Sequence, residues 1–288
     1  MATLVGGIEA GGTKFVCVVG TPDGEIKDSV RFPTEAPEQT MANVFKFFDQ
    51  YDVKVIAIGS FGPIDINEDS ATYGYITSTP KPGWTNFDFV GAMEKQYPGV
   101  KILWTTDVNI AGYGEYKAGA AKGHKNVLYV TVGTGVGVGY VQDGKFFQGF
   151  SHPEGGHMLP RRYPGDDFKG VCPYHGSCIE GLTAGPAVEA RAGKKGHLLA
   201  ADDKVWDYEA FYLAQACATY TVTFRPDIIV FGGGVMKQEQ LFDKIRKQTA
   251  ELLNGYLDTP NMEDYIVHVG LGDDAGIKGC LLWAGDNL

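Results

Sequence analysis

Four residues with metal-binding side chains lie near one another in the sequence: His157, Cys172, His175 and Cys178. The last three fall within seven residues. Thiolate sulfur and imidazole nitrogen are the ligands that tetrahedral zinc prefers, and four of them leave no coordination position open. The spacing therefore predicts a structural zinc ion. The alternatives are a disulfide between Cys172 and Cys178, or buried thiols beside surface histidines.

Three glycine-rich segments follow apolar stretches that predict strands. They are Gly11-Gly12-Thr13-Lys14, Gly133-Thr134-Gly135-Val136-Gly137 and Gly232-Gly233-Gly234. Glycine lets backbone N–H groups approach phosphate oxygens, and the first two segments add hydroxyl groups and a cation. The third leaves room for a flat ligand such as a nucleoside. Neither of the first two has the spacing of the usual P-loop or of a dinucleotide-binding turn. A turn without a ligand is the alternative for each segment.

Two carboxylates are candidates for work on a substrate. Asp107 lies where a predicted strand passes into a predicted helix, a place where a general base can act in a crevice at strand ends. Local sequence alone favours a simpler role for Asp107, the N-cap of that helix. Glu154 could accept hydrogen bonds from a polyol, or it could be a solvated acid in a loop.

The elements that position these residues form a repeated pattern. Strand, glycine turn, strand and Asp-Gly turn occur twice, and Asp23-Gly24 and Asp143-Gly144 are 120 residues apart. This order indicates an internal duplication with one copy in each lobe, although two Asp-Gly hairpins could also arise by chance. The predicted strands are 4–8, 14–19, 53–58, 101–104, 126–132, 136–141, 227–231 and 265–269, and the predicted helices are 40–51, 108–121, 208–224, 241–252 and 274–284.

The composition limits the classes of protein to consider. A chain of 288 residues suits two compact lobes. A net charge of −10 without a run of Lys and Arg argues against nucleic-acid binding. No stretch approaches the roughly eighteen consecutive apolar residues of a membrane span. The N-terminus lacks the features of a signal peptide, and five cysteines is an odd number, so we expect a cytoplasmic protein without a disulfide framework.

Taken in order, the motifs resemble the ROK family (repressor, open reading frame, kinase), and they are most similar to its bacterial fructokinase branch. The resemblance runs from the N-terminus to the last helix and rests on Ile8-Glu9-Ala10-Gly11-Gly12-Thr13-Lys14, Gly62-Pro63-Ile64-Asp65, Thr79-Pro80 with Gly83-Trp84, Asp107-Val108-Asn109-Ile110-Ala111, the Gly133 segment, Glu154-Gly155-Gly156-His157 and the cysteine segment. It implies an α/β fold with two lobes, the actin-like and hexokinase-like ATPase fold with a duplicated βββαβα-type core. We expect an N-terminal lobe over 1–110 and a C-terminal lobe with the zinc-binding loop over 111–269. A final helix at about 270–288 would pack back on the first lobe.

The resemblance also implies a reaction, in which ATP phosphorylates a hexose, preferably fructose at its 6-hydroxyl. Asp107 would be the general base, and Glu154, His157, Glu180 and Thr106 would lie at the sugar. Pro186 and the segment Gly234-Val235-Met236-Lys237-Gln238 match nucleoside-side positions. His157 would bind zinc through one ring nitrogen and the sugar through the other. Family members are usually homodimers and need Mg²⁺.

Three other functions are considered beside this one. The first is a broader hexose kinase that accepts mannose or glucose. The second is a sugar-responsive transcription regulator, but such family members carry an added helix-turn-helix, and here the first glycine turn begins within about ten residues of the start. The third is a sugar-binding protein without catalysis, which the presence of Asp107 and both glycine turns argues against.

The sequence departs from the family pattern at three positions. Glu9 stands where many members have Asp, and the longer side chain still suits Mg²⁺ or its waters. Thr106 stands where glucose-type members have Asn, which removes one hydrogen-bond partner for a sugar hydroxyl and weakens a glucose assignment. His175 replaces a common Cys, and the set of four zinc ligands is kept.

Overall fold

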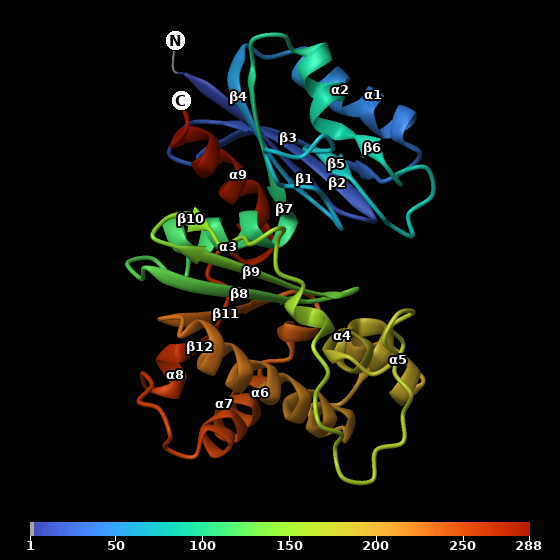
Figure 1. Ribbon diagram of the computed structural model, residues 1–288, viewed down its shortest axis with the longest axis vertical. Coiled ribbons are helices and arrows are strands. Elements are labelled where there is room, and N and C mark those ends of the chain that lie inside the picture. The colour runs from blue at the N-terminus through green and yellow to red at the C-terminus, as the bar shows by residue number, and fades with distance from the viewer. Residues whose placement is uncertain (1–2) are drawn as a thin grey trace.

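Two five-stranded sheets with the same strand order form the centres of two lobes in this computed structural model, which describes residues 3–288 (Figure 1). The first sheet has the order β3-β2-β1-β4-β7, and the second has the order β10-β9-β8-β11-β12. In each sheet the first three strands are each antiparallel to their neighbour, and the last two run parallel to the central strand. The shared order confirms the predicted duplication.

The strands of the two sheets correspond one to one along the chain. The first sheet contains β1 (Leu4–Ala10), β2 (Lys14–Gly20), β3 (Ile26–Pro33), β4 (Val53–Ser60) and β7 (Lys101–Thr106). The second contains β8 (Asn126–Val132), β9 (Val136–Gln142), β10 (Lys145–Phe146), β11 (Ile228–Gly232) and β12 (Ile266–His268). The central strands are almost wholly buried, as expected for apolar runs covered by helices on both faces.

One face of the first sheet is covered by α1 (Pro37–Phe48), α2 (Phe89–Gln96) and the short ladder of β5 (Tyr75–Ile76) with β6 (Phe87–Asp88). Helix α1 begins with Pro37, whose fixed φ suits the first turn, and its apolar positions recur at helical spacing. The fully buried Trp84 packs against several aromatic rings in this core, including Phe15 and Phe61.

The opposite face of the first sheet is covered by α3 (Asp107–Ala118) and α9 (Ala275–Gly285). Helix α9 is the last helix of the chain, and it packs on the N-terminal strands β1, β2 and β4. Helix α3 also packs on β8 and β9 of the second sheet, so it lies between the lobes (Figure 1). The boundary expected after residue 110 therefore falls within a helix that contacts both sheets.

The second lobe carries the remaining α-helices of residues 3–288. They are α4 (Ile179–Thr183), α5 (Gly185–Ala192), α6 (Val205–Phe224), α7 (Gln240–Leu253) and α8 (Met262–Tyr265), with single 3₁₀ turns at Gly155–His157, Gly196–Leu198, Val235–Lys237 and Gly272–Asp274. The long helix α6 is buried along most of its length and packs beside α7. Its Trp206 and Tyr212 are among the largest fully buried side chains.

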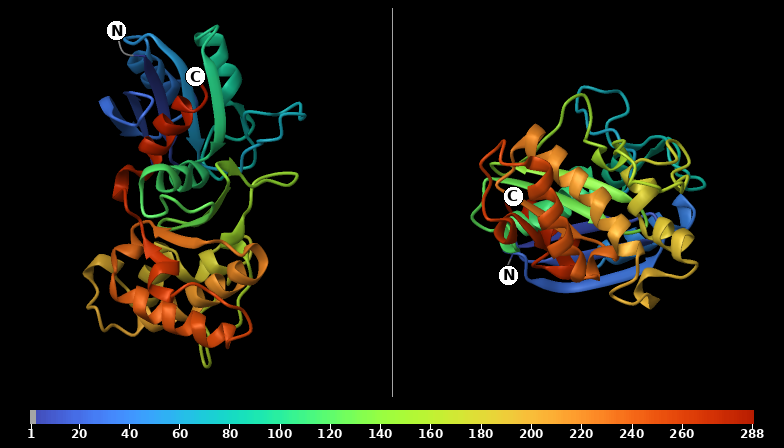
Figure 2. Two further views of the ribbon diagram at one scale, coloured as in Figure 1. Left: turned by 90° about the vertical axis from the view of Figure 1, so that its left-hand side faces the viewer. Right: turned by 90° about the horizontal axis from the view of Figure 1, so that it is seen from below.

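Among residues 3–288, no helix is both long enough and apolar enough to cross a bilayer. All five cysteines are free thiols, so the structure excludes the predicted alternative of a Cys172–Cys178 disulfide. Figure 2 shows that the first described strand and the last helix lie in the same lobe, while the middle of the chain builds the other.

Candidate active site

Asp107 is the first residue of α3, directly after β7, as the sequence predicts. The simpler interpretation of Asp107 as the N-cap is wrong. Thr106 is the cap, because its Oγ1 accepts a hydrogen bond of 3.1 Å from the N–H of Asn109. The carboxylate of Asp107 accepts 2.9 Å from the N–H of Val108, which fixes its direction at the start of the helix. Asp107 is thus free of the capping role and available to a substrate.

The surroundings of Asp107 raise its pKa to about 7. Burial is the main cause, and the negative charges of Glu9 and Glu154 add to it. A carboxylate with such a pKa is a competent proton acceptor near neutral pH. The influence of Glu9 and Glu154 also shows that a residue of the first lobe and a residue of the second lobe both lie near Asp107.

Glu9, near the end of β1, is the second acid of this region. Its pKa is raised, mainly because the carboxylate is buried, while the positive charge of Lys14 acts in the opposite direction. Lys14 is exposed at the start of β2, on the other side of the first glycine turn. The turn is closed by a hydrogen bond of 2.9 Å from the N–H of Gly11 to the Lys14 carbonyl, and Gly12 and Thr13 lie at its tip.

The second glycine turn is closed by a shorter loop, with a hydrogen bond of 2.9 Å from the N–H of Gly133 to the Gly135 carbonyl. Thr134 is exposed at its tip. Gly156 packs directly on this hairpin, and a Cβ there would overlap the carbonyl oxygen of Val136. Only glycine therefore lets the segment with Glu154 and His157 lie so close to the turn.

The residues expected at the sugar fall in this same region. Glu154 is about half exposed, and its pKa is raised by burial and by the nearby charge of Glu180. One carboxylate oxygen of Glu180 accepts 3.1 Å from the N–H of Val136, so Glu180 is tied to the second turn. His152 is a residue that the sequence motifs do not indicate. Its Nε2 accepts 3.4 Å from the N–H of Ile64 in the first lobe, and its Nδ1 lies 3.5 Å from Oε1 of Glu154.

The four predicted metal ligands come together. Their ligand atoms all lie within 4.8 Å of one another. Nδ1 of His157 lies 3.8 Å from Sγ of Cys172 and 3.6 Å from Sγ of Cys178, and Nδ1 of His175 lies 3.7 Å from Sγ of Cys172. Bonds of about 2.1–2.3 Å in a tetrahedral zinc site place neighbouring ligand atoms roughly 3.4–3.8 Å apart, so the residues fit this ion.

The polypeptide around the four ligands is tightly folded. Cys172 and Gly176 exchange backbone hydrogen bonds of 3.3 and 2.9 Å, which brings His175 back toward Cys172. Cys178 is the N-cap of α4, and its sulfur accepts 3.4 Å from the N–H of Gly181. Burial raises the pKa of the Cys178 thiol to about 11, and the hydrogen bond from Gly181 acts in the opposite direction.

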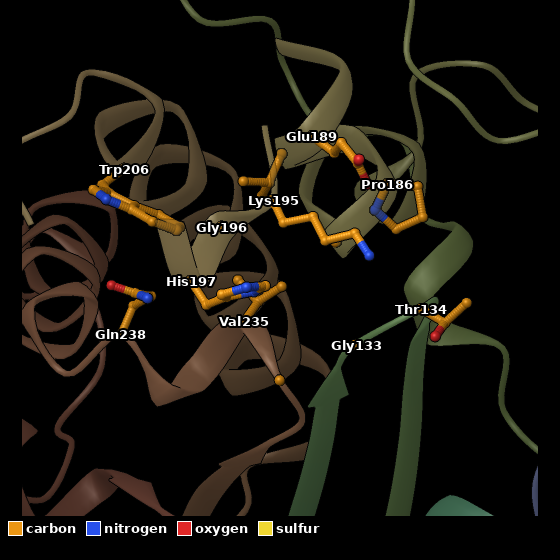
Figure 3. Close-up of a pocket in the computed structure, with 13 residues that line it drawn as sticks. Gly133, Thr134, Pro186, Glu189, Lys195, Gly196, His197, Trp206, Val235 and Gln238 are labelled. Carbon is orange, nitrogen blue, oxygen red and sulfur yellow. The ribbon is translucent and has the colours of Figure 1, made fainter. Parts of the chain in front are cut away.

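A cavity of about 390 Å³ opens beside the second glycine turn (Figure 3). Six of the residues predicted on the ATP side line it: Gly133, Thr134, Pro186, Gly234, Val235 and Gln238. The walls also include residues that the motifs do not indicate, namely Gly185, Val188, Glu189, Lys195, Gly196, His197 and Trp206. These come from α5, from the loop after it and from the first turn of α6, where the sequence has no glycine motif or repeated pattern.

The other nine residues predicted on the ATP side do not line the cavity: they are the first glycine turn Gly11-Gly12-Thr13-Lys14, Gly135, and four residues at and after the end of β11. Gly232 is the last residue of β11, and Gly233 turns the chain with a φ of +91°. Met236 is fully buried in the core of the second lobe. Lys237 points to an ion pair of 3.0 Å with Asp273. The segment after β11 therefore contributes Gly234, Val235 and Gln238 to the cavity and uses its other residues for folding.

The paired sheets and the acids between them define a protein of the actin-like and hexokinase-like ATPase class. A ROK hexokinase from Thermus thermophilus has this fold, with a TM-score of 0.82, 26% identity and 99% of each chain covered. Residues 5–287 match the model of the ROK family. The chain therefore belongs to the ROK family, and the predicted fold class is confirmed.

Two relatives are similar over nearly their whole length. The fructokinase of Pediococcus pentosaceus is 52% identical over 281 residues, which covers 98% of this chain and 97% of the relative. The fructokinase of Streptococcus mutans is 48% identical over 272 residues, with 93% and 92% covered. The resemblance to the fructokinase branch drawn from the motifs is confirmed.

Proposed function

We propose that this protein transfers the γ-phosphoryl group of ATP to the 6-hydroxyl of D-fructose. The observation that carries the proposal is Asp107, a carboxylate with a pKa of about 7 at the end of β7, between a residue of each lobe. The names of relatives at 52% and 48% identity support fructose as the acceptor. The cavity beside the second glycine turn supports a nucleotide as the donor.

In the proposed reaction, the fructose hydroxyl attacks the γ-phosphorus while Asp107 accepts its proton. The new P–O bond forms as the bond between the γ-phosphorus and the oxygen of the leaving ADP breaks. Positioning and charge stabilisation carry most of the catalysis in such a transfer. Backbone N–H groups of the two glycine turns and the ammonium of Lys14 would offset the charge on the phosphoryl group.

Magnesium is part of the proposal as the partner of ATP. Two neighbouring acids, Glu9 and Asp107, have raised pKa values because burial disfavours their charge, and a divalent cation would relieve this cost. Glu9 would hold the ion directly or through water. When bound, Mg²⁺ neutralises charge on the phosphate oxygens.

Fructose would be held by residues of the second lobe and the start of α3. Glu154 and the carboxylate oxygen of Glu180 that is not bonded to Val136 would accept hydrogen bonds from sugar hydroxyls. His157 turns Nδ1 toward the cysteine sulfurs, so its Nε2 would remain for a hydroxyl. The hydroxyl of Thr106 accepts the capping bond and keeps its own hydrogen to donate.

The acceptor is tested by measuring kcat/KM for fructose, mannose and glucose with one enzyme preparation and Mg²⁺-ATP. We expect fructose to have the highest value and mannose to be the secondary acceptor. A higher value for glucose would exclude the fructokinase assignment, and comparable values for all three would favour the alternative of a broader hexose kinase. ATP consumption that does not depend on any sugar would contradict the kinase itself.

We also propose that His157, Cys172, His175 and Cys178 hold one structural zinc ion. The ion would fix the segment that carries Glu154 and His157 against the second turn, so it would act on sugar binding without a role in the chemical step. Elemental analysis of protein purified without chelators should give one zinc per chain. Cys178→Ala should lose the metal and raise the KM for fructose.

Cys217→Ala is the matched control for the zinc proposal. Cys217 is a fully buried thiol of α6 in the core of the second lobe, and it is outside the group of four ligands. Its variant should keep one zinc per chain. Purified wild-type protein without zinc, or Cys178→Ala with a full zinc content, would contradict the proposed site.

The family expectation of a cytoplasmic homodimer remains part of the proposal. Support for self-association comes from the outer surface of α6 and the end of α7, where apolar side chains are exposed. Leu159, Val222, Leu252 and Tyr256 are 70%, 51%, 37% and 84% exposed, and they surround a shallow cavity. A second copy of the chain would cover this surface.

A further inference from the structure

Lys195 directs its ammonium group into the cavity beside the second glycine turn. Figure 3 shows the side chain extending from the loop after α5 toward Thr134, across the middle of the cavity. Its Nζ belongs to none of the ion pairs found among residues 3–288. The sequence motifs do not indicate this residue, and the reaction proposed above does not use it.

The loop that carries Lys195 is well anchored. Leu199 is 8% exposed and packs in the core of the second lobe. The N–H of Leu198 donates 2.9 Å to the Lys195 carbonyl, and Nε1 of Trp206 donates 2.8 Å to the carbonyl of Ala200. The backbone of Lys195 is therefore held on the cavity wall, and only the side chain needs to be ordered when a ligand binds.

The cavity has two chemically different ends. Gly133 and Thr134, the turn expected to bind phosphate, lie at one end, and Trp206 and Gln238 lie at the other (Figure 3). A nucleotide with its terminal phosphates at the turn would place its base toward Trp206 and Gln238. The group between them, close to the ammonium of Lys195, would be the α-phosphate.

We propose that Lys195 binds the α-phosphate of the nucleotide. An ammonium on a flexible stem is a compact charge that suits a phosphate oxygen without demanding a fixed angle. The contact would add affinity for ATP, ADP and AMP and none for adenosine. Glu189 also lines the cavity, and an ion pair with it when the nucleotide is bound is the competing role for Lys195.

The inference rests on the proposed function, because it assumes that a nucleotide fills the cavity. The test measures the Kd of ADP, AMP and adenosine by calorimetry for wild-type protein, Lys195→Ala and Lys194→Ala. Lys194 is the matched control, since it is the exposed neighbour on the same loop and does not line the cavity. We expect Lys195→Ala to raise the Kd of ADP and of AMP by about tenfold, which is the range of a charged hydrogen bond at a partly exposed site. The Kd of adenosine should not change.

Steady-state kinetics give a second readout. Lys195→Ala should raise the KM for ATP by about tenfold without changing the KM for fructose, and Lys195→Arg should recover most of the loss because it keeps the charge. The inference would be overturned if Lys195→Ala weakened the binding of adenosine and ADP equally, or if the Lys195 and Lys194 variants had the same Kd values. Either result would leave the proposed function standing. Wild-type protein that binds no ADP would overturn both.

Discussion

At the scale of single residues, Asp107 combines two properties that oppose each other. A negative charge on its carboxylate is unfavourable, because the group is buried and two other acids lie near it. The same surroundings bring its pKa close to neutral pH, as a general base requires. Burial of the ionised carboxylate therefore lowers the free energy of unfolding, and it gives Asp107 the pKa that the proposed proton transfer requires.

The first prediction concerns Asp107→Asn, which should fold normally and lose roughly 10²–10⁴-fold in kcat, the range for a removed general base. In wild-type enzyme kcat/KM should rise with pH up to the pKa of about 7, because only the deprotonated Asp107 accepts a proton. Asp202→Asn, at an exposed position in the loop before α6, is the control and should keep full activity. A fully active Asp107→Asn would leave this residue without a catalytic role.

The same substitution has a consequence for stability. The pKa of Asp107 rises from an unfolded value of about 4 to about 7 in the folded protein. The folded state therefore binds the proton more tightly, and the free energy of unfolding of wild-type protein should fall as pH rises through this window. Asp107→Asn should lack this part of the pH dependence, which denaturant unfolding at pH 5 and pH 8 would measure.

The second prediction concerns Thr106, whose hydroxyl caps α3. Thr106→Asn should keep the cap, because Asn caps helices at least as well as Thr, and it should add an amide for a sugar hydroxyl. We expect the ratio of kcat/KM for glucose to that for fructose to increase about tenfold, the value of one neutral hydrogen bond. Thr106→Ser keeps the hydroxyl without an amide, and a similar increase in that variant would show that the amide is not responsible.

At the scale of elements, α3 and α9 cross at very short range. Gly114 of α3 faces the carbonyl of Ala275, and Gly279 of α9 faces the carbonyl of Ile110, so that a Cβ on either glycine would overlap the other helix. Small residues at both points let the two backbones touch. Helix α3 begins with Asp107, and α9 packs on β1, the strand that contains Glu9. The crossing of α3 and α9 therefore determines the positions of these two acids relative to each other.

The third prediction is that Gly279→Ala destabilises the protein. Ala is a better helix former than Gly by about 1 kcal/mol, which alone would stabilise α9. The overlap with the Ile110 carbonyl should outweigh this gain, giving a net loss of about 1–3 kcal/mol in the free energy of unfolding. Urea unfolding should show the loss in Gly279→Ala and not in Lys278→Ala, the neighbouring position on the same helix. Equal stability of the two variants would mean that the crossing can open without cost.

The elements with strong patterns could be predicted from the sequence. Buried apolar runs indicate β1, β4, β8 and β11, and their predicted ends differ by only a few residues from those observed. Strand β3 is mostly exposed, so it lacks an apolar run, and only the Asp-Gly turn before it indicates a partner for β2. The short helices α4 and α5 have no repeated apolar pattern, and their positions depend on contacts with the 3₁₀ turn Gly155–His157 and with α6.

The candidate site likewise contains residues that local sequence patterns indicate and residues that they do not. The four residues proposed to bind zinc and Asp107 could be found because each belongs to a local pattern of residue types. Lys195 and Trp206 could not be found from the sequence. The sequence around a lysine in a loop or a tryptophan in a helix is the same whether or not the side chain faces a cavity. His152, which lies beside Glu154, contacts Ile64 of the first lobe only after the lobes come together, and such long-range contacts leave no trace in local spacing.

At the scale of the whole molecule, the two lobes share one plan and carry different tasks. The first sheet supplies Glu9, Lys14 and, at the end of β7, Asp107. The second supplies the cavity beside the second glycine turn, the four residues proposed to bind zinc and the acids proposed for the sugar. Because Glu9, Lys14 and Asp107 lie on one lobe and the proposed nucleotide and sugar residues lie on the other, closure of the lobes would complete the site and exclude water from the phosphoryl group.

The position of α9 also determines the order in which the protein can be completed during its synthesis. The face of the first sheet that contains Val5, Val18 and Ala57 is covered by Ile277 and Leu281, which lie in the last helix. A ribosome makes this sheet first and its cover last, with the whole second lobe in between. The second lobe can therefore fold while the first still exposes an apolar sheet, the reverse of the usual N-terminal-first order. The 11 residues of α9 therefore complete the cover that α3 begins, and they protect the apolar face of this sheet from aggregation.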